Sequence, residues 1–252
     1  MIEERKTLPE SVGGLFDTAF AMYGRRFGLN TVVALLGFGA QAVCAELFAT
    51  LGVHGDDPIF VLQSIVAIFV DAFIVGVVAI GVIADLSVTE ANAQNILASA
   101  LERWPSLIAV SALIAIIMVV PQQAVAESGV GSFFLYVLPV AALSGAIVFA
   151  TVACAADASI LGLRIIGSFA QSIRIALFPT NFGRAVIIGI ATLVPLLVQA
   201  VLLDQFSLRH VRGTLFWANV PVDVLSVGPL EAVFAVFYID FVRRLKAAEA
   251  NR

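Results

Sequence analysis

The chain has 252 residues, of which 61% are hydrophobic and only 13% are charged, and its mean hydropathy is +1.03. A soluble domain of this length covers its surface with far more charge, so the composition excludes that class of protein. It predicts an all-α, polytopic membrane helix bundle in which residues 1–252 form a single integral membrane domain. The formal net charge of −4 indicates no class of partner.

Apolar runs of about twenty residues recur along the chain. At a helical rise of about 1.5 Å per residue, each run can cross a hydrocarbon core of about 30 Å. Windows of about 19 residues therefore predict six transmembrane helices. They cover residues 29–52, 59–84, 106–125, 133–156, 184–203 and 222–242.

The basic residues are distributed unevenly between the two sides of the membrane that these spans create. With the N-terminus in the cytoplasm, 12 of the 14 Lys and Arg residues lie inside, and only Arg209 and Arg212 lie outside. Lys and Arg accumulate in the cytoplasmic loops of membrane proteins. Both termini are therefore predicted to be cytoplasmic.

A segment rich in aromatic residues and arginine precedes the first, third and fifth spans. In the first segment, Phe16, Phe20, Tyr23 and Phe27 recur at helical spacing on one face. The pattern predicts cytoplasmic interfacial amphipathic helices, each followed by a hairpin of two spans.

Shifts of 77 and 155 residues place Trp104 and Phe182, respectively, under Phe27 of the first segment. This alignment predicts a three-fold pseudo-repeat with units at 12–85, 89–160 and 166–244. Because each unit has an even number of spans, successive units keep one orientation, which excludes an inverted-topology repeat. Chance alignment of three interfacial helices is the alternative.

Two acidic residues, Asp71 and Glu231, fall in the middle of predicted spans. A carboxylate at the bilayer centre costs about 2.5–3.5 kcal/mol on insertion scales, so both side chains are expected to face the bundle or water. One interpretation makes them a transport path for a proton or cation. The other makes them neutral acids, hydrogen-bonded to Ser, Gln or backbone on a neighbouring helix.

A second set of acids marks the cytoplasmic ends of the even-numbered spans. We expect these acids to pair with arginines of the interfacial segments, holding each segment against its hairpin. Partly exposed pairs of this kind are worth about 0–1 kcal/mol each. The alternative is that the acids only mark where lipid stops. The acids are Asp85, Asp157 and Asp240, and the arginines are Arg25, Arg26, Arg103 and Arg174.

Small residues predict tight contacts between helices. Gly37, Gly39 and the stretch from Ala141 to Gly145 lie within predicted spans. Small side chains let neighbouring helices approach closely. This spacing is common in membrane helices, so it indicates neither a partner nor an oligomeric state.

Motifs for catalysis or cofactor binding are missing from the sequence. The two histidines, His54 and His210, fall on the predicted outer side, and no zinc-ligand spacing, P-loop or nucleophile elbow occurs. We therefore expect no cofactor, no metal and no enzymatic activity. Nucleic-acid binding is not expected either, because no basic domain lies outside the membrane.

The first and last helical patterns resemble a group of uncharacterised bacterial six-span integral membrane proteins, which is similar to the membrane region adjoining some glycerophosphoryl diester phosphodiesterases. The resemblance rests on the Phe16, Phe20, Tyr23, Phe27 pattern, on Ala170-Gln-Ser172, and on Tyr238-Ile-Asp240-Phe-Val-Arg243-Arg244. It implies the fold and a multi-pass position in the bacterial inner membrane. It implies no phosphodiesterase activity, because that domain is missing from this chain.

These patterns leave two functions open. The first is a non-enzymatic scaffold or accessory factor whose cytoplasmic face contacts membrane lipid or a protein partner. The second is a transporter or channel for a small solute or lipid that uses Asp71 and Glu231. A solute-accessible cavity reaching Asp71 would favour transport, whereas a tightly filled bundle centre would favour the scaffold.

Overall fold

The structure is a computed structural model of the chain, and it describes residues 8–51, 60–87, 91–126, 130–157, 161–205 and 212–250. Within these ranges all regular secondary structure is helical and no strand occurs, so the predicted all-α class is confirmed. The helices are α1 (Val12–Arg25), α2 (Phe27–Thr50), α3 (Phe60–Leu86), α4 (Ala93–Ala126), α5 (Val130–Ile147), α6 (Phe149–Ala156), α7 (Leu161–Ala176), α8 (Pro179–Gln205) and α9 (Arg212–Ala250).

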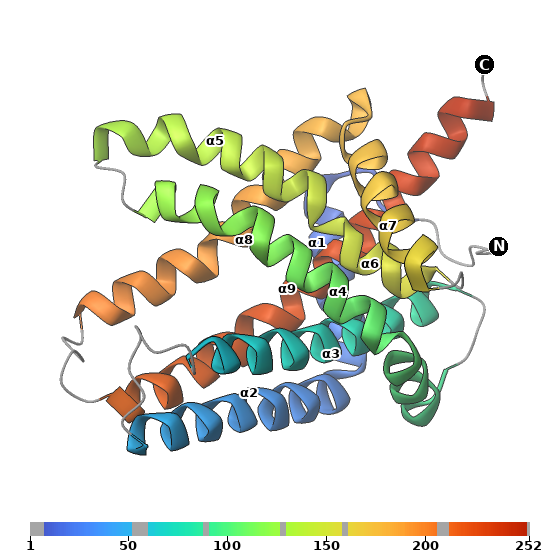
Figure 1. Ribbon diagram of the computed structural model, residues 1–252. Coiled ribbons are helices and arrows are strands. Elements are labelled where there is room, and N and C mark those ends of the chain that lie inside the picture. Colours follow the sequence, from blue (N-terminus) through green and yellow to red (C-terminus); the bar gives the residue numbers. More distant parts are fainter. Residues whose placement is uncertain are drawn as a thin grey trace.

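Long apolar helices run back and forth between the two ends of the bundle (Figure 1). The pair formed by α7 and α8 is bent by 106° and adds a further span only if it is counted as one broken span. The described residues therefore have the five or six helices of a multi-pass membrane protein, and the predicted number of six is reached only with the bent pair. Five other stretches are long and apolar enough to cross a membrane: Phe27–Phe48, Ile65–Leu86, Ala93–Met118, Val137–Ala156 and Val220–Ala250.

The helix ends fall into two groups (Figure 1). The starts of α2, α4 and α8 and the ends of α3, α6 and α9 lie at one end of the bundle, together with both chain termini. We call this the basic end, because the ion pairs of Arg26, Arg184 and Arg244 lie there. At the opposite end α4 and α8 finish and α5 and α9 begin.

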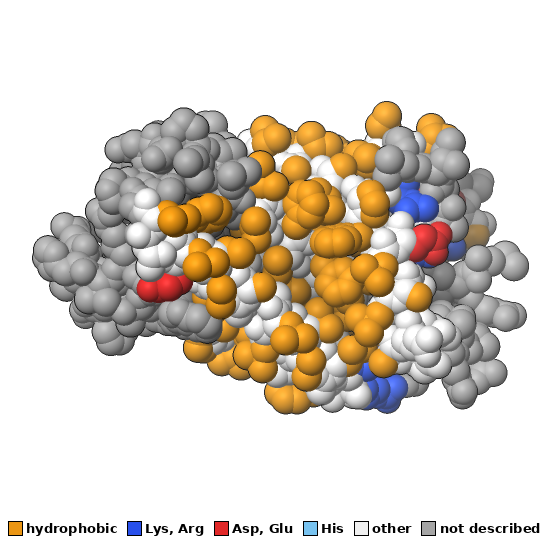
Figure 2. All heavy atoms as spheres, turned by 60° about the horizontal axis from the view of Figure 1, so that its bottom comes forward, with side chains coloured by type: hydrophobic (Ala, Val, Ile, Leu, Met, Phe, Trp, Pro, Cys, Tyr) orange, Lys and Arg blue, Asp and Glu red, His pale blue; other side chains and the backbone are white. Residues whose placement is uncertain are grey.

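The outer surface between the two ends is apolar. Leu36 of α2 is 71% exposed and Ile116 of α4 is 68% exposed. Figure 2 shows hydrophobic side chains forming a broad belt, with charged side chains near its margins. A belt of this extent is unfavourable in water and matches the hydrocarbon region of a bilayer.

The aromatic stripe of the first segment divides between the bundle and its surroundings. Phe16 packs edge-on against Phe237 of α9, with ring centroids 5.3 Å apart, and Tyr23 is buried. Phe20 and Phe27 are more than half exposed. The inward face of α1 consists of Leu15, Ala19, Met22 and Tyr23.

Tyr23 contacts α9 at Gly228. A Cβ atom added at Gly228 would lie 2.8 Å from the Tyr23 ring, so a larger residue there would displace the ring. Burial raises the pKa of the Tyr23 hydroxyl above its ordinary value of 10.0, and a hydrogen bond with Thr31 opposes that shift. Tyr23 is therefore a neutral contact between α1 and α9 at physiological pH.

Helix α7 buries several polar side chains against the bundle and exposes several apolar ones. Arg164, Ser168 and Ser172 are buried against the bundle, whereas Leu163 and Ile166 are 64% and 71% exposed. The buried groups are hydrogen-bonded, Arg164 to Ser106 of α4 and Ser172 to the Ala146 carbonyl of α5, and the exposed Gln171 donates to the Tyr238 hydroxyl of α9. A helix with this distribution is stable only where its outer face meets lipid.

Helices α5 and α8 approach each other through small residues. A Cβ atom at Gly145 would overlap the backbone of Ala185, and one at Gly189 would overlap the backbone of Ala141. The small residues therefore lie in reciprocal positions, four residues apart on each helix. The stretch from Ala141 to Gly145 predicted a close helix contact without naming its partner, and the structure shows that the partner is α8.

The segment before the third span differs from the expected separate helix. Residues 93–105 belong to α4 and continue into the span without a break. Pro105 removes one backbone hydrogen bond but does not end the helix. The Trp104 indole anchors this part of α4, because its Nε1 donates to the Phe69 carbonyl at 2.8 Å and its ring packs against Phe69 and Phe73.

Candidate functional site

A partly open cavity of about 420 Å³ lies between α3, α4, α5, α6, α8 and α9. Its volume is that of a small-molecule site or of roughly a dozen water molecules. No Lys or Arg is among the described residues that line it. Its polar lining has two carboxyl groups and five hydroxyl groups, from Ser111, Ser144, Thr151, Thr192, Asp223, Ser226 and Glu231.

Glu231 is buried at the wall of this cavity, with 4% of its surface exposed. The Thr151 hydroxyl of α6 donates to its Oε1 at 3.3 Å, but the same hydroxyl lies 2.9 Å from the Val148 carbonyl. A hydroxyl has one proton to donate, so the nearer carbonyl competes for it. The Glu231 carboxyl group therefore keeps most of its hydrogen-bonding capacity for whatever occupies the cavity.

Asp71 lies beside the cavity but is not part of its lining. The Gln41 amide of α2 donates to Asp71 Oδ1 at 3.0 Å and to the Ala67 carbonyl at 3.3 Å. Val75, one turn further along α3, does line the cavity. The structure thus gives each predicted intramembrane acid a neutral donor on a neighbouring helix, and it does not bring Asp71 and Glu231 together.

A third acid, Asp223, shares the surroundings of Glu231 in the cavity and of Asp71 beside it. The sequence analysis did not identify this residue. Asp223 lines the cavity and interacts electrostatically with Asp71. It falls at the edge of the predicted span 222–242, where acidic residues are common, so its position alone predicts no functional site. The available signal was helical spacing, since the α9 residues of the lining are Asp223, Ser226, Val227, Leu230, Glu231 and Phe234.

At the basic end, Arg26 and Asp85 form a two-pronged ion pair. Arg26 Nη2 lies 2.5 Å from Asp85 Oδ1, and Nε lies 3.1 Å from Oδ2. The same guanidinium donates to the Ala91 carbonyl at 3.0 Å. Both side chains are less than one fifth exposed. The pair joins the start of α2 to the end of α3 and to the residues just before α4.

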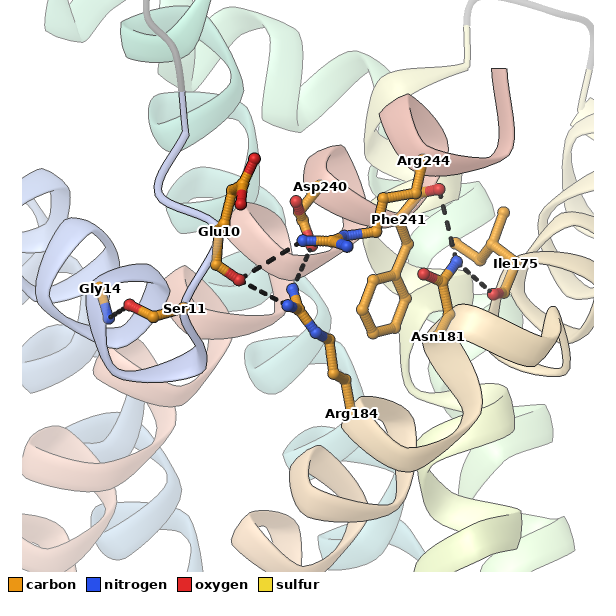
Figure 3. Close-up of polar contacts among 9 residues, drawn as sticks. All are labelled: Glu10, Ser11, Gly14, Ile175, Asn181, Arg184, Asp240, Phe241 and Arg244. Carbon is orange, nitrogen blue, oxygen red and sulfur yellow. Dashed lines mark hydrogen bonds and ion pairs between the residues drawn. The ribbon is translucent and has the colours of Figure 1, made fainter. Parts of the chain in front are cut away.

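Asp240 is the centre of a second charged cluster, but its partners are not the predicted arginines. Arg184 Nη1 lies 2.9 Å from Asp240 Oδ2, and Arg244 Nε lies 2.8 Å from the same oxygen. Both guanidiniums also donate to the Glu10 carbonyl (Figure 3). The prediction for Asp240 is therefore wrong in its partners, because the start of α8 and the next turn of α9 bring closer arginines than α1, α4 or α7 do.

A buried amide lies next to this cluster. Asn181 Nδ2 donates to the Ile175 carbonyl at 2.9 Å and to the Phe241 carbonyl at 3.4 Å (Figure 3). Ile175 lies near the end of α7, so the amide bridges the turn between α7 and α8 to α9. The sharp bend of the α7–α8 pair is thereby fixed to the same helix that contains Asp240 and Glu231.

The remaining predicted residues have other surroundings. Arg174 forms an exposed ion pair with Glu249 in place of the expected aspartate. Arg25 is exposed and makes no ion pair with another described residue. Arg103 interacts electrostatically with Arg164, Glu102 and Asp157. Among the described residues, no three His, Cys, Asp or Glu side chains are grouped closely enough to hold a metal ion.

Comparisons with known proteins add no relative. No protein-family model, no curated protein and no solved structure matches the chain. The bacterial membrane family and the function are therefore proposals that rest on this chain's own residues and geometry.

Proposed function

We propose that this protein is a non-enzymatic transporter of the bacterial inner membrane, with six spans and both termini in the cytoplasm, that binds a small cation in its central cavity. The observation that supports this most strongly is the buried Glu231 carboxyl group facing a cavity of about 420 Å³. The uneven distribution of Lys and Arg supports the orientation, and the sequence resemblance supports the membrane.

The chemistry of the lining favours a cation over an anion or a neutral apolar solute. Carboxyl and hydroxyl oxygens are acceptors that coordinate an alkali cation or an amine, and the described lining has no basic side chain to repel it. A charged carboxylate buried in this environment is unfavourable without a counter-charge. An incoming cation supplies that counter-charge.

The order of the acidic residues along α9 indicates the side from which a cation would enter. Asp223 precedes Glu231 by eight residues, which is about 12 Å along a helix. Asp223 is nearer than Glu231 to the start of α9, which lies at the end of the bundle opposite to the basic end, and Asp71 interacts electrostatically with Asp223. We infer that Asp71 and Asp223 attract the cation at that side and that Glu231 holds it deeper in the bundle.

The alternative function, a scaffold or accessory factor with a lipid or protein partner at the cytoplasmic face, needs no chamber at the bundle centre. The cavity does not reach Asp71, but it favours transport because an acid-lined space within a bundle weakens packing and is disfavoured unless it has a use. The three-fold repeat is part of the same proposal. Separate helices α1 and α7 before α2–α3 and α8–α9 support its first and third units.

The test compares Glu231→Gln with Glu46→Gln, which removes the same charge from α2, away from the cavity lining. Each purified protein is reconstituted in lipid nanodiscs, and thermal unfolding is followed with sodium, ammonium, methylammonium and choline. At 100 times its dissociation constant, a bound cation stabilises the protein by about 2.7 kcal/mol. We expect at least one cation to stabilise the wild type and Glu46→Gln but not Glu231→Gln.

Uptake of the same cation into proteoliposomes then tests transport. We expect uptake by the wild type and none by Glu231→Gln. If no cation stabilises the wild type, or if Glu231→Gln responds as the wild type does, the cation site is wrong. Stabilisation without uptake contradicts the transport step and leaves a cation-binding membrane protein.

A further inference from the structure

A second pocket, of about 280 Å³, lies at the basic end and is separate from the central cavity. The end of α3 forms one wall with Ile80, Ile83 and Ser87, and the first part of α4 forms the other. Ala156, the last residue of α6, completes it. Among the described residues, none lines both this pocket and the central cavity.

The α4 wall presents a row of hydrogen-bond donors. Asn95, Ser99 and Arg103 line the pocket at intervals of four residues, so they lie on one face of the helix. None of these three side chains donates a hydrogen bond to another described residue. Arg103 contrasts with Arg26, Arg184 and Arg244, whose guanidiniums all contact carboxylates at the same end.

Arg103 forms no ion pair with another described residue. Arg103 interacts electrostatically with a second cation, Arg164, and with the acids Asp157 and Glu102. Glu102 is exposed and is the neighbour of Arg103 in the helix, so it points in a different direction. Asp85, the acid at the nearby end of α3, is already engaged by Arg26.

The rest of the lining is apolar and lies at the depth where a span ends. Ile80, Ile83 and Ile96 form a hydrophobic floor beneath the donors. The apolar stretch of α3 ends at Leu86, next to Ser87 of the pocket, and the donors lie in the first part of the apolar stretch Ala93–Met118 of α4. The pocket thus combines donors for an oxyanion with an apolar lining.

We propose that this pocket binds the phosphate group of an anionic phospholipid, with Arg103 as its charged ligand and Asn95 and Ser99 as neutral donors. A guanidinium with two neutral donors matches the several acceptor oxygens of a phosphate. The isoleucine floor accommodates the first part of an acyl chain. Free inorganic phosphate has no apolar part that could pack on the isoleucines, so the lipid is the favoured source of the phosphate group.

The experiment measures lipid retention by the purified, delipidated full-length protein. Native mass spectrometry is used to titrate phosphatidylglycerol, phosphatidylcholine and inorganic phosphate against the wild type, Arg103→Gln and Arg25→Gln. Arg25→Gln removes the same charge from the same end at an exposed position outside the pocket. We expect the wild type and Arg25→Gln to prefer phosphatidylglycerol, and Arg103→Gln to bind it at least tenfold more weakly.

Three results overturn the proposal. They are equal binding of phosphatidylglycerol and phosphatidylcholine, equal weakening by Arg25→Gln and Arg103→Gln, and binding of inorganic phosphate as tight as that of the lipid. If Arg103→Gln does not fold, Ser99→Ala replaces it, with an expected weakening of about threefold; unchanged binding by that variant also overturns the proposal. Loss of cation binding in Glu231→Gln leaves this result unaffected, because the described linings of the two sites share no residue.

Discussion

Burial separates two ion pairs that lie at the same end of the bundle. The side chains of Arg26 and Asp85 are 19% and 15% exposed, whereas those of Arg174 and Glu249 are 66% and 49% exposed. Water screens the second pair and leaves its partners solvated when one is removed. Removal of Asp85 instead leaves the Arg26 guanidinium partly buried without its anion.

We therefore expect Asp85→Asn to lower the free energy of unfolding by about 2 kcal/mol, and Glu249→Gln by about 0.5 kcal/mol or less. Reversible unfolding in mixed detergent micelles measures both. The exchanged pair Arg26→Asp with Asp85→Arg should recover part of the loss, but not the bond to the Ala91 carbonyl. Equal losses from Asp85→Asn and Glu249→Gln would contradict this account of burial.

The ion pairs also show which residue contacts could be predicted from the sequence. Asp85 and Arg26 belonged to the expected set, because acids at span ends and arginines before spans meet wherever a hairpin closes. Asp240 was expected in a pair, but its partner Arg184 had been counted only as the start of a span. Choosing among arginines at one end of a bundle requires the angle at which α8 meets α9, and no local pattern encodes that angle.

At the scale of elements, the tightest contact is the one between α5 and α8. Gly145 and Gly189 admit the backbone of the opposite helix where any side chain would overlap it. Gly39 of α2, by contrast, has open space where a Cβ atom would be placed. All three glycines have a helical backbone conformation, so they differ in how closely a neighbouring helix approaches them.

We expect Gly145→Ala to destabilise the protein by about 1–3 kcal/mol, since α5 and α8 must move apart. Gly39→Ala should be neutral or stabilising by up to about 1 kcal/mol, because alanine is the better helix former. Thermal unfolding in detergent compares the two variants directly. A Gly145→Ala protein as stable as Gly39→Ala would show that the helices do not approach as closely as described.

Helix α7 shows why element-level patterns are ambiguous in a membrane protein. Arg164, Ser168 and Ser172 alternate with leucine and isoleucine, which predicts an amphipathic helix. This pattern does not decide whether the polar or the apolar face packs against the bundle. The structure places the polar face inward because Ser106, the Ala146 carbonyl and Tyr238 offer partners there. Those partners come from three other helices, so the choice follows only from the assembled bundle.

At the scale of the whole molecule, the sequence predicted the class of protein well and its cavity not at all. Runs of apolar residues suffice for the helices, because a bilayer leaves few other backbone structures. A cavity depends on which side chains fail to meet, and that is a property of packing. Glu231 was nevertheless singled out by the energetic penalty of placing an acid in lipid.

The proposed orientation, with both termini in the cytoplasm, predicts the pattern of labelling by a membrane-impermeant maleimide. In a Cys44→Ser, Cys154→Ser background, His54→Cys is expected to react in intact cells, and Lys246→Cys only after permeabilisation. His54 lies outside the described residues, whereas Lys246 is exposed on α9 at the basic end. Reaction of Lys246→Cys in intact cells would place the C-terminal tail outside and reverse the topology.

The contact between the beginning and the end of the chain sets the order in which the bundle is completed. The Glu10 carbonyl and Phe16 meet Arg244 and Phe237, which the ribosome adds more than two hundred residues later. A nascent or truncated chain therefore presents the inner face of α1 without its cover. That face is covered only when α9, the last helix of the chain to be made, docks against it.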